Sequence, residues 1–173
     1  LGAPVAAAWA AAHPERVRRL VLYGGWAVGE QLSPESARAH VLALVSAHWG
    51  LGSDVLTEIF APDLGGAARS RLARYQRASA SAETAHGLLA LGFRLDIRTL
   101  LAGVTAPTLV LHREADRAVP LAQGEALAAG IAGARLIVLP GRSHLPYASD
   151  ADAVVREARR FLGSRGAARD AGV

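Results

Sequence analysis

Polar side chains that could carry acid–base chemistry follow two short apolar runs of the sequence. Glu114 and Asp116 come after the run Thr108–Leu111. His144 comes after the run Leu136–Leu139. A carboxylate beside a histidine is the acid–base half of a nucleophilic triad, because the acid fixes the imidazole tautomer and stabilises the imidazolium that forms when the base takes a proton. His144 with either Asp116 or Glu114 is therefore the candidate acid–base pair.

Each of these side chains also has an interpretation without chemistry. His144 could be a loop histidine satisfied by hydrogen bonds, and Asp116 could merely cap the turn before Val119-Pro120. We favour function for both, because open parallel sheets bind their ligands beyond the carboxyl ends of the strands. His112 is interpreted as a strand-end residue rather than a ligand.

The other histidines give no metal site. They fall in a His-Pro turn or on expected helices, at spacings that match no zinc motif: His13, His40, His48 and His86. We expect neither a metal nor an organic cofactor.

The elements that position these residues alternate between strand and helix. Strands are expected over Val17–Tyr23, where Gly24-Gly25 follow, and over the two apolar runs above. Helices are expected over three ranges, namely Leu1–Ala12, Leu121–Ile131 and a last one from Ser149 or Asp150 to Leu162. Short apolar strands alternating with helices predict an α/β fold with a parallel sheet covered on both faces.

Strand character is missing from about Ser33 to Arg98, which predicts an all-helical insertion. Three serines are expected to cap its helices: Ser33 ahead of Pro34, Ser53 and Ser81. The division is then 1–30 and 99–162 as core, 31–98 as insertion and 163–173 as a flexible tail. Arginines between Arg69 and Arg77 spread around one helix and indicate a solvated surface. An apolar substrate pocket is expected from three aromatic residues: Trp26, Trp49 and Phe93.

The start of the chain resembles a known family. Leu-Gly-Ala-Pro-Val-Ala at Leu1–Ala6, then His-Pro-Glu-Arg-Val at His13–Val17, resemble the segment directly behind the nucleophile elbow of α/β-hydrolases. In that family's Gly-x-Ser-x-Gly motif, the serine sits on a strained strand-to-helix turn. Gly2 matches the last glycine and Leu1 the residue after the serine, which would lie one position upstream of this chain.

The resemblance continues to about Leu162. Asp116 in Leu-His-Arg-Glu-Ala-Asp matches the family's acid, and His144 in Gly-Arg-Ser-His matches its histidine. Their order is also the family's. The helical insertion sits where the family carries its lid. The resemblance implies the C-terminal half of an α/β-hydrolase, apparently incomplete.

The resemblance further implies a serine esterase-like enzyme acting on a small, apolar, ester-like substrate. The upstream serine would attack, His144 would shuttle its proton, Asp116 would orient His144, and the amide of Leu1 would be one oxyanion-hole donor. Two alternatives stay open. One is a non-catalytic, hydrolase-like ligand-binding module of a regulatory protein; the other is an epoxide hydrolase or dehalogenase with an aspartate nucleophile.

Composition excludes several other classes. The 173 residues are on the scale of one domain. All nineteen basic residues are Arg, and the net charge of +4 is too mild to indicate a nucleic-acid partner. The absence of Cys excludes a disulfide scaffold and a thiol nucleophile within these residues. No apolar run reaches the ~18–20 residues of a membrane span, so no membrane partner is expected.

The chain contains no Met and opens at Leu1 within an apolar helical pattern. We therefore expect it to be the C-terminal part of a longer protein, and a cytoplasmic location is only the default because a targeting segment would lie upstream. The chain alone is expected to lack triad activity and to expose one edge of the strand Val17–Tyr23. The oligomeric state stays open.

Overall fold

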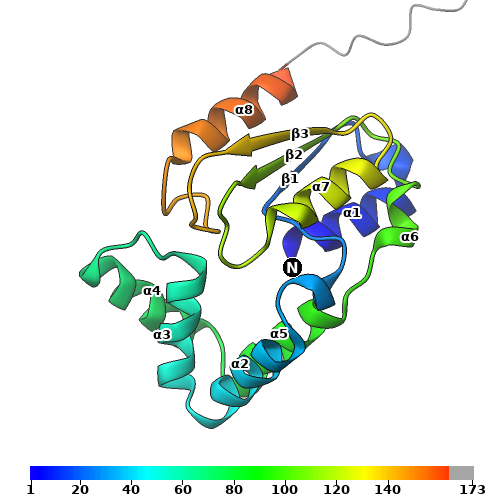
Figure 1. Cartoon of the computed structure of the whole chain (residues 1–173). Coiled ribbons are helices and arrows are strands. Elements are labelled where there is room, and N and C mark those ends of the chain that lie inside the picture. Colours follow the sequence, from blue (N-terminus) through cyan, green and yellow to red (C-terminus); the bar gives the residue numbers. More distant parts are fainter. Residues whose placement is uncertain (164–173) are drawn as a thin grey trace, which may run out of the picture.

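The computed structural model describes residues 1–163 and centres on a parallel sheet (Figure 1). The sheet has the order β1-β2-β3, with β1 at Leu20–Tyr23, β2 at Thr108–Arg113 and β3 at Arg135–Leu139. Leu22 pairs with Val110, and Val110 with Leu136, so the carboxyl ends of all three strands lie at one edge. The predicted strands are confirmed, although β1 starts later than Val17 and β2 runs on to Arg113.

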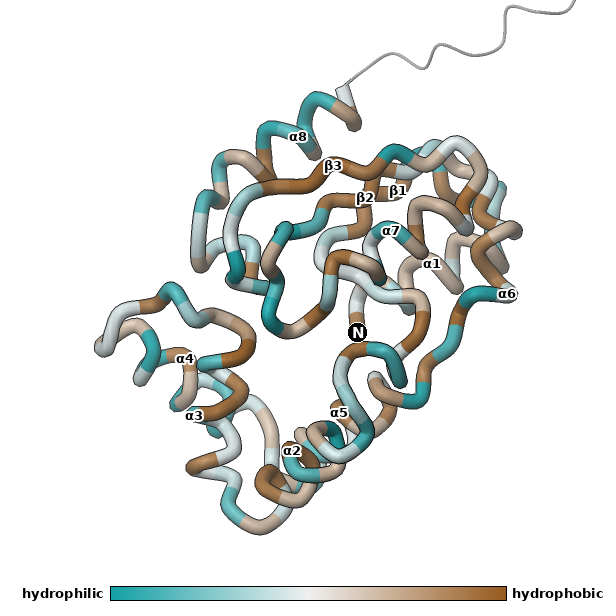
Figure 2. The backbone as a smooth tube through the Cα atoms, in the orientation of Figure 1, coloured by the Kyte–Doolittle hydropathy of each residue, from teal (hydrophilic) through white to brown (hydrophobic). Residues whose placement is uncertain are grey.

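Helices cover both faces of the sheet, as predicted. One face carries α1 (Gly2–Ala12), α6 (Arg98–Leu101) and α7 (Leu121–Gly130), and the other carries α8 (Ala151–Gly163). Successive strand residues point to opposite faces. Leu22 and Val110 therefore pack with Leu127 of α7, whereas Leu109 packs with Phe161 of α8. Figure 2 shows the hydrophobic colours running along β3 while α8 carries hydrophilic residues.

The first helix is more exposed than its composition predicts. Ala7 and Ala10 are buried against the sheet, but Val5 and Trp9 are 59% and 42% exposed. The helix ends at Ala12, and the short 3₁₀ turn Pro14–Arg16 follows it, as the His-Pro pair predicts.

The helical insertion is confirmed as a run of helices between β1 and β2. Its members, after a 3₁₀ turn at Gly29–Gln31, are α2 (Glu35–Ala47), α3 (Trp49–Phe60), α4 (Gly66–Ser79) and α5 (Ala82–Arg94). In Figure 1 these helices lie apart from the sheet, beyond the end of the strands that carries the candidate pair. A separate apolar cluster around Val45, Leu56 and Ala85 holds α2, α3 and α5 together.

The predicted serine caps are correct at one position. Ser81 Oγ accepts the Thr84 N–H at 3.1 Å and caps α5. Pro34, not Ser33, is the N-cap of α2, with no side-chain cap bond. Ser53 lies inside α3, where its hydroxyl donates to a backbone carbonyl of the preceding turn instead of capping.

The two ends of the insertion are joined directly to each other. Val28 and Asp96 form an antiparallel bridge, and the Gly29 N–H donates to the Leu95 carbonyl at 2.7 Å. A Cβ on Gly29 would lie 2.0 Å from the Gly92 carbonyl oxygen. Only glycine therefore permits this approach of the two backbones.

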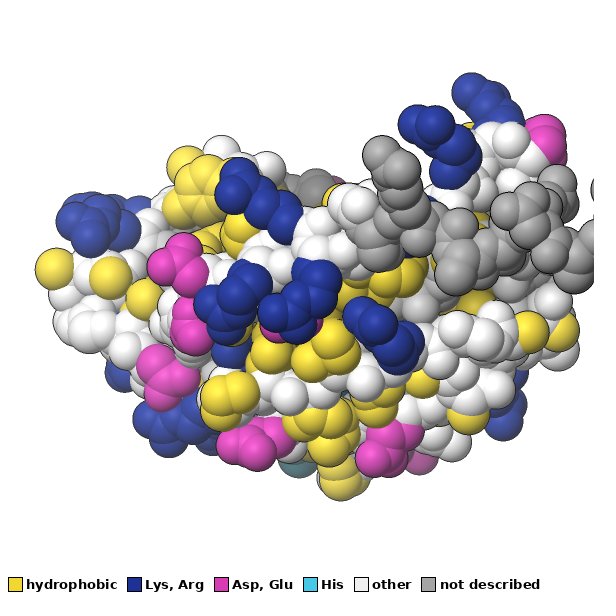
Figure 3. Space-filling model, turned by 90° about the horizontal axis from the view of Figure 1, so that it is seen from above, with side chains coloured by type: hydrophobic (Ala, Val, Ile, Leu, Met, Phe, Trp, Pro, Cys, Tyr) yellow, Lys and Arg dark blue, Asp and Glu magenta, His cyan; other side chains and the backbone are white. Residues whose placement is uncertain are grey.

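Charged side chains are mixed on the surface seen in Figure 3, where arginines lie next to acidic and hydrophobic residues. Within residues 1–163, no helix combines the length and the apolar character that crossing a membrane requires.

We predict that Gly29→Ala lowers the free energy of unfolding by about 1–3 kcal/mol, because the new methyl group must force the two backbones apart. Gly87→Ala is the matched control, since a Cβ there meets nothing within 4 Å on α5. It should be neutral or stabilising by up to about 1 kcal/mol. Urea denaturation measures both values, and equal stability of the two variants would contradict the close approach.

Candidate active site

Asp116 and His144 meet at the carboxyl ends of neighbouring strands. Asp116 lies in the turn after β2 and His144 in the loop after β3, and Asp116 Oδ2 is 2.8 Å from His144 Nδ1. The Asp116 side chain is fully buried, and that of His144 is 20% exposed. The other carboxylate oxygen, Oδ1, accepts the N–H groups of Ala118 at 2.8 Å and Val119 at 3.0 Å. The turn thus fixes the carboxylate with one oxygen directed at the histidine.

His144 is fixed by contacts with Phe60 and Gly24. The His144 N–H donates to the Phe60 carbonyl at 2.8 Å, and the two rings pack with centroids 5.8 Å apart. On the β1 side, a Cβ on Gly24 would lie 2.8 Å from His144 Cε1. Gly24 also has a backbone φ of +55°, which residues other than glycine rarely adopt. The loop after β1 therefore contributes close packing of Gly24 against the imidazole rather than a polar group.

This arrangement assigns the two ring nitrogens of His144 to different tasks. An ionised carboxylate can only accept hydrogen bonds, so the nitrogen that faces it must carry a proton. The contact with Asp116 therefore places the proton of the neutral ring on Nδ1. Nε2 then carries the free lone pair and can act as a general base. Once Nε2 is protonated, the buried carboxylate stabilises the positive ring.

Arg113 holds the base of the loop that carries His144. This fully buried side chain donates from Nη1 to the Pro140 carbonyl at 2.8 Å and from Nη2 to the Asp150 carbonyl at 2.9 Å. Its Nε donates to the Tyr23 hydroxyl at 3.2 Å. Because Pro140 and Asp150 stand at the two ends of the loop between β3 and α8, one guanidinium fixes both ends.

Tyr23 supports Arg113 as a neutral partner. Burial raises the pKa of the Tyr23 phenol, and the neighbouring Arg113 only partly opposes this. Sequence reasoning missed Arg113. The available signal was an arginine at the end of an otherwise apolar strand, because such a buried charge requires several acceptors.

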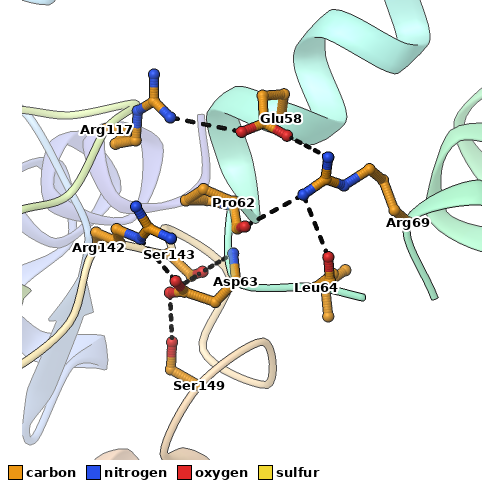
Figure 4. A network of polar contacts seen from close by, with 9 residues as sticks. All are labelled: Glu58, Pro62, Asp63, Leu64, Arg69, Arg117, Arg142, Ser143 and Ser149. Carbon is orange, nitrogen blue, oxygen red and sulfur yellow. Dashed lines mark hydrogen bonds and ion pairs between the residues drawn. The ribbon is translucent and has the colours of Figure 1, made fainter. Parts of the chain in front are cut away.

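The insertion contacts the same loop through Asp63, which follows α3 (Figure 4). Asp63 Oδ1 accepts Arg142 Nε at 2.7 Å, and Oδ2 accepts the Ser143 hydroxyl at 2.8 Å. Ser149 Oγ lies 3.5 Å from the same Oδ2. The hydrogen bond from Arg142, helped by that from Ser143, holds the pKa of Asp63 below its usual value. Asp63 is therefore ionised at neutral pH and remains an acceptor.

A second contact joins the insertion to the loop of the acid. Glu58 on α3 forms an ion pair with Arg69 at 2.8 Å and a longer one, at 3.5 Å, with Arg117, the neighbour of Asp116 (Figure 4). Arg69 also donates to the carbonyls of Pro62 and Leu64. The end of α3 thus contacts both loops of the candidate pair.

A cavity of about 440 Å³ lies between the pair and the insertion. Its wall is mostly apolar, and His144 and Arg117 contribute polar groups to it. The apolar lining residues come from both parts of the fold and include Leu1, Trp26, Val41, Leu56, Phe60, Leu88, Phe93 and Val119.

The structure places two of the three predicted pocket aromatics in this cavity. Trp26 and Phe93 line it together with Leu1 and His144. Trp49 does not line it; it packs in the internal cluster of the insertion, and its indole N–H donates to the Ala80 carbonyl at 2.9 Å. The helix that contains it, α3, begins at Trp49 itself and not behind Ser53 as expected.

The remaining candidates lie outside the pair. His112 is fully buried, with Nε2 2.9 Å from the Val119 carbonyl, as expected of a strand-end residue. Glu114 is exposed, and the carboxylate in contact with His144 is that of Asp116. Nowhere in residues 1–163 do three or more His, Asp or Glu side chains form a group that could hold a metal ion.

Gly24→Ala tests the close approach to His144. We predict a displaced imidazole, seen as a change in the His144 Cε1–H resonance, and a loss of about 1–2 kcal/mol of stability from the positive φ. Gly133→Ala is the matched control, because Gly133 has φ +68° but a Cβ there meets nothing within 4 Å. It should lose similar stability and leave the His144 signal in place. A change of the His144 resonance in both variants, or in neither, would contradict the packing of His144 on Gly24.

Comparisons with known proteins agree with this architecture. The sequence model of the "Alpha/beta hydrolase family" matches residues 1–157. The chain is 31% identical over 170 residues to the pimeloyl-[acyl-carrier protein] methyl ester esterase of Chromobacterium violaceum. That alignment covers 94% of this chain and 67% of the esterase.

Solved structures of other hydrolases also resemble this chain. A hydrolase from Oleispira antarctica matches 95% of the chain with a TM-score of 0.84 at 13% identity, a similarity of fold alone. A thermophilic esterase from Thermogutta terrifontis matches 93% with a TM-score of 0.67 at 28% identity. The chain spans 63% and 61% of their respective lengths. These similarities confirm the predicted fold class.

Proposed function

This chain belongs to the alpha/beta hydrolase family, and we propose that it supplies the acid–base pair and the substrate cavity of an esterase. The observation that carries the proposal is the contact of a fully buried carboxylate, Asp116, with a partly exposed imidazole, His144, in the wall of an apolar cavity. A charged carboxylate is buried at a cost unless its partners compensate it. The pair is thus better explained by proton transfer than by stability alone.

The nucleophile is proposed to be a serine bonded to the nitrogen of Leu1. Leu1 and His144 line the same cavity, so a residue preceding Leu1 would stand close to the ring that must take its proton. Leu1 is also the N-cap of α1, and the amides at a helix N-terminus favour negative charge. The Leu1 amide would then serve as an oxyanion-hole donor, an interaction worth about 2.7–4 kcal/mol in a measured case.

The reaction follows from these positions. His144 Nε2 removes the hydroxyl proton as the oxygen attacks the ester carbonyl, and Asp116 stabilises the imidazolium. The ring then gives the proton to the departing alkoxide, which leaves as the alcohol. In the second half a water loses its proton to Nε2 and attacks the acyl group. The bond from the acyl carbon to the serine oxygen breaks, the ring returns its proton to that oxygen, and the carboxylic acid is released, so one water is consumed for each ester cleaved.

The substrate is proposed to be a small ester with an apolar acyl or alcohol part. The mostly apolar cavity favours such a group, since its burial removes apolar surface from water. The relatives at 31% and 28% identity are both called esterases, one of them acting on a methyl ester by its name. Because residues such as Val41 and Leu88 of the insertion line the cavity, the insertion is proposed to act as a lid.

The test uses the longer protein that this proposal requires, with p-nitrophenyl esters of short acids. His144→Ala should lower kcat/KM by about 10³-fold or more, and Asp116→Asn by up to about 10⁴-fold, because an amide favours the wrong ring tautomer. His40→Ala, on the exposed surface of α2, is the control and should leave the rate unchanged.

Two outcomes would overturn the proposal. One is a His144→Ala variant with the rate of the control. The other is a coding sequence without a nucleophilic residue directly before the Leu1 codon. Aspartate at that position would instead indicate an aspartate-nucleophile hydrolase, and ligand binding without hydrolysis would indicate a binding module.

A further inference from the structure

Two segments far apart in the sequence are bound together at the candidate pair. The Phe60 carbonyl accepts the N–H groups of His144 at 2.8 Å and Leu145 at 3.3 Å. Three residues further on, Asp63 accepts Arg142 and Ser143 through its carboxylate, and its own N–H lies 3.4 Å from Ser143 Oγ. Every residue from 142 to 145 is therefore bound by the stretch 60–63, where α3 ends.

The bond between Asp63 and Ser143 is the most consequential of these contacts. Ser143 is fully buried, so water cannot replace a lost partner of its hydroxyl. Leaving a buried hydroxyl unpaired is costly, which constrains Ser143 to stay beside the carboxylate. Because Ser143 directly precedes His144, this constraint also fixes the backbone from which the imidazole projects.

The ion pair of Asp63 with Arg142 has a smaller role. Its side chains are 33% and 55% exposed, and exposed ion pairs contribute little to stability. Arg142 contributes mainly by orienting the Asp63 carboxylate through the hydrogen bond from its Nε. Figure 4 shows Asp63 at the centre of these contacts, with the insertion on one side and the loop of His144 on the other.

We propose that Asp63 is a positioning residue for His144, through which the helical insertion fixes the geometry of the acid–base pair. A displacement of the α3–α4 corner would move Ser143 and with it the imidazole relative to Asp116. The insertion then determines proton transfer as well as the shape of the cavity. The kinetic consequence rests on the proposed esterase function, whereas the structural consequence does not.

The experiment compares Asp63→Ala, Asp63→Asn and Ser143→Ala by two measurements. The first is the His144 Cε1–H resonance of the ligand-free protein, assigned by its loss in His144→Ala. The second is kcat and KM of ester hydrolysis. Asp63→Ala should shift the resonance and lower kcat about 10- to 100-fold, since a small misplacement of a catalytic group is that costly. KM should change little.

The other variants separate positioning from general damage. Asp63→Asn should recover much of the loss, because its amide oxygen can still accept the Ser143 hydroxyl. Ser143→Ala combined with Asp63→Ala should be clearly non-additive, as expected of two residues acting through one bond. Asp54→Ala is the control, since it removes an acid that lies on α3 3.6 Å from Arg77, away from the loop. It should alter neither measurement.

The proposal is overturned if Asp63→Ala loses stability while the His144 resonance and kcat match those of Asp54→Ala. Additive effects of Asp63→Ala and Ser143→Ala would overturn it as well. If the unaltered protein has no esterase activity, the proposed function fails alone, because the resonance still reports whether Asp63 positions His144.

Discussion

The parallel pairing of β2 with β3 is the constraint on which the site depends. Parallel strands end at the same edge of a sheet, so the loops after β2 and β3 emerge side by side. One loop turns back at once, and the amides of Ala118 and Val119 hold one oxygen of Asp116. The other oxygen contacts His144 in the loop after β3. A shift of one residue in the register would move Asp116 away from the ring.

The loop of His144 is long and polar, and buried partners hold it in one conformation. Arg113, at the end of β2, binds the two ends of this loop, and Asp63 and Phe60 of the insertion bind its middle. Gly24 leaves space for the ring where any side chain would collide. A buried polar group left unpaired, or a side chain forced against the ring at Gly24, would lower the stability of the fold. The stability of the fold therefore maintains the geometry of the pair, in addition to the hydrogen bond between Asp116 and His144.

The sequence was sufficient to predict the sheet, the insertion and the pair itself. Short apolar runs identify buried strands, and polar residues directly after them identify one edge. His144 and an acid at Glu114 or Asp116 could therefore be found without knowing any contact, and the family resemblance selected Asp116. The supporting residues could not be found in this way. Arg113 binds Asp150 across 37 positions, and Asp63 binds Ser143 across 80, and no local pattern encodes such partners.

Errors arose where several local structures fit the same residues. Ser53 is a good helix cap by type, yet α3 had already begun at Trp49, and its hydroxyl bonds within the helix. Trp49 fits a pocket as well as it fits a helix core, and packing against Leu56 and Val45 decides between them. Periodicity places a side chain on a face, but tertiary packing determines what that face contacts.

The most direct test of the central claim is the tautomer of His144, read from the ¹⁵N chemical shifts of its ring at a pH where the imidazole is neutral. The geometry predicts a proton on Nδ1 and a free lone pair on Nε2. Asp116→Asn should reverse this preference, since the new amide can donate to Nδ1. A ring with its proton on Nε2, or a ring indifferent to Asp116→Asn, would contradict the assignment of Asp116 and His144 as an acid–base pair.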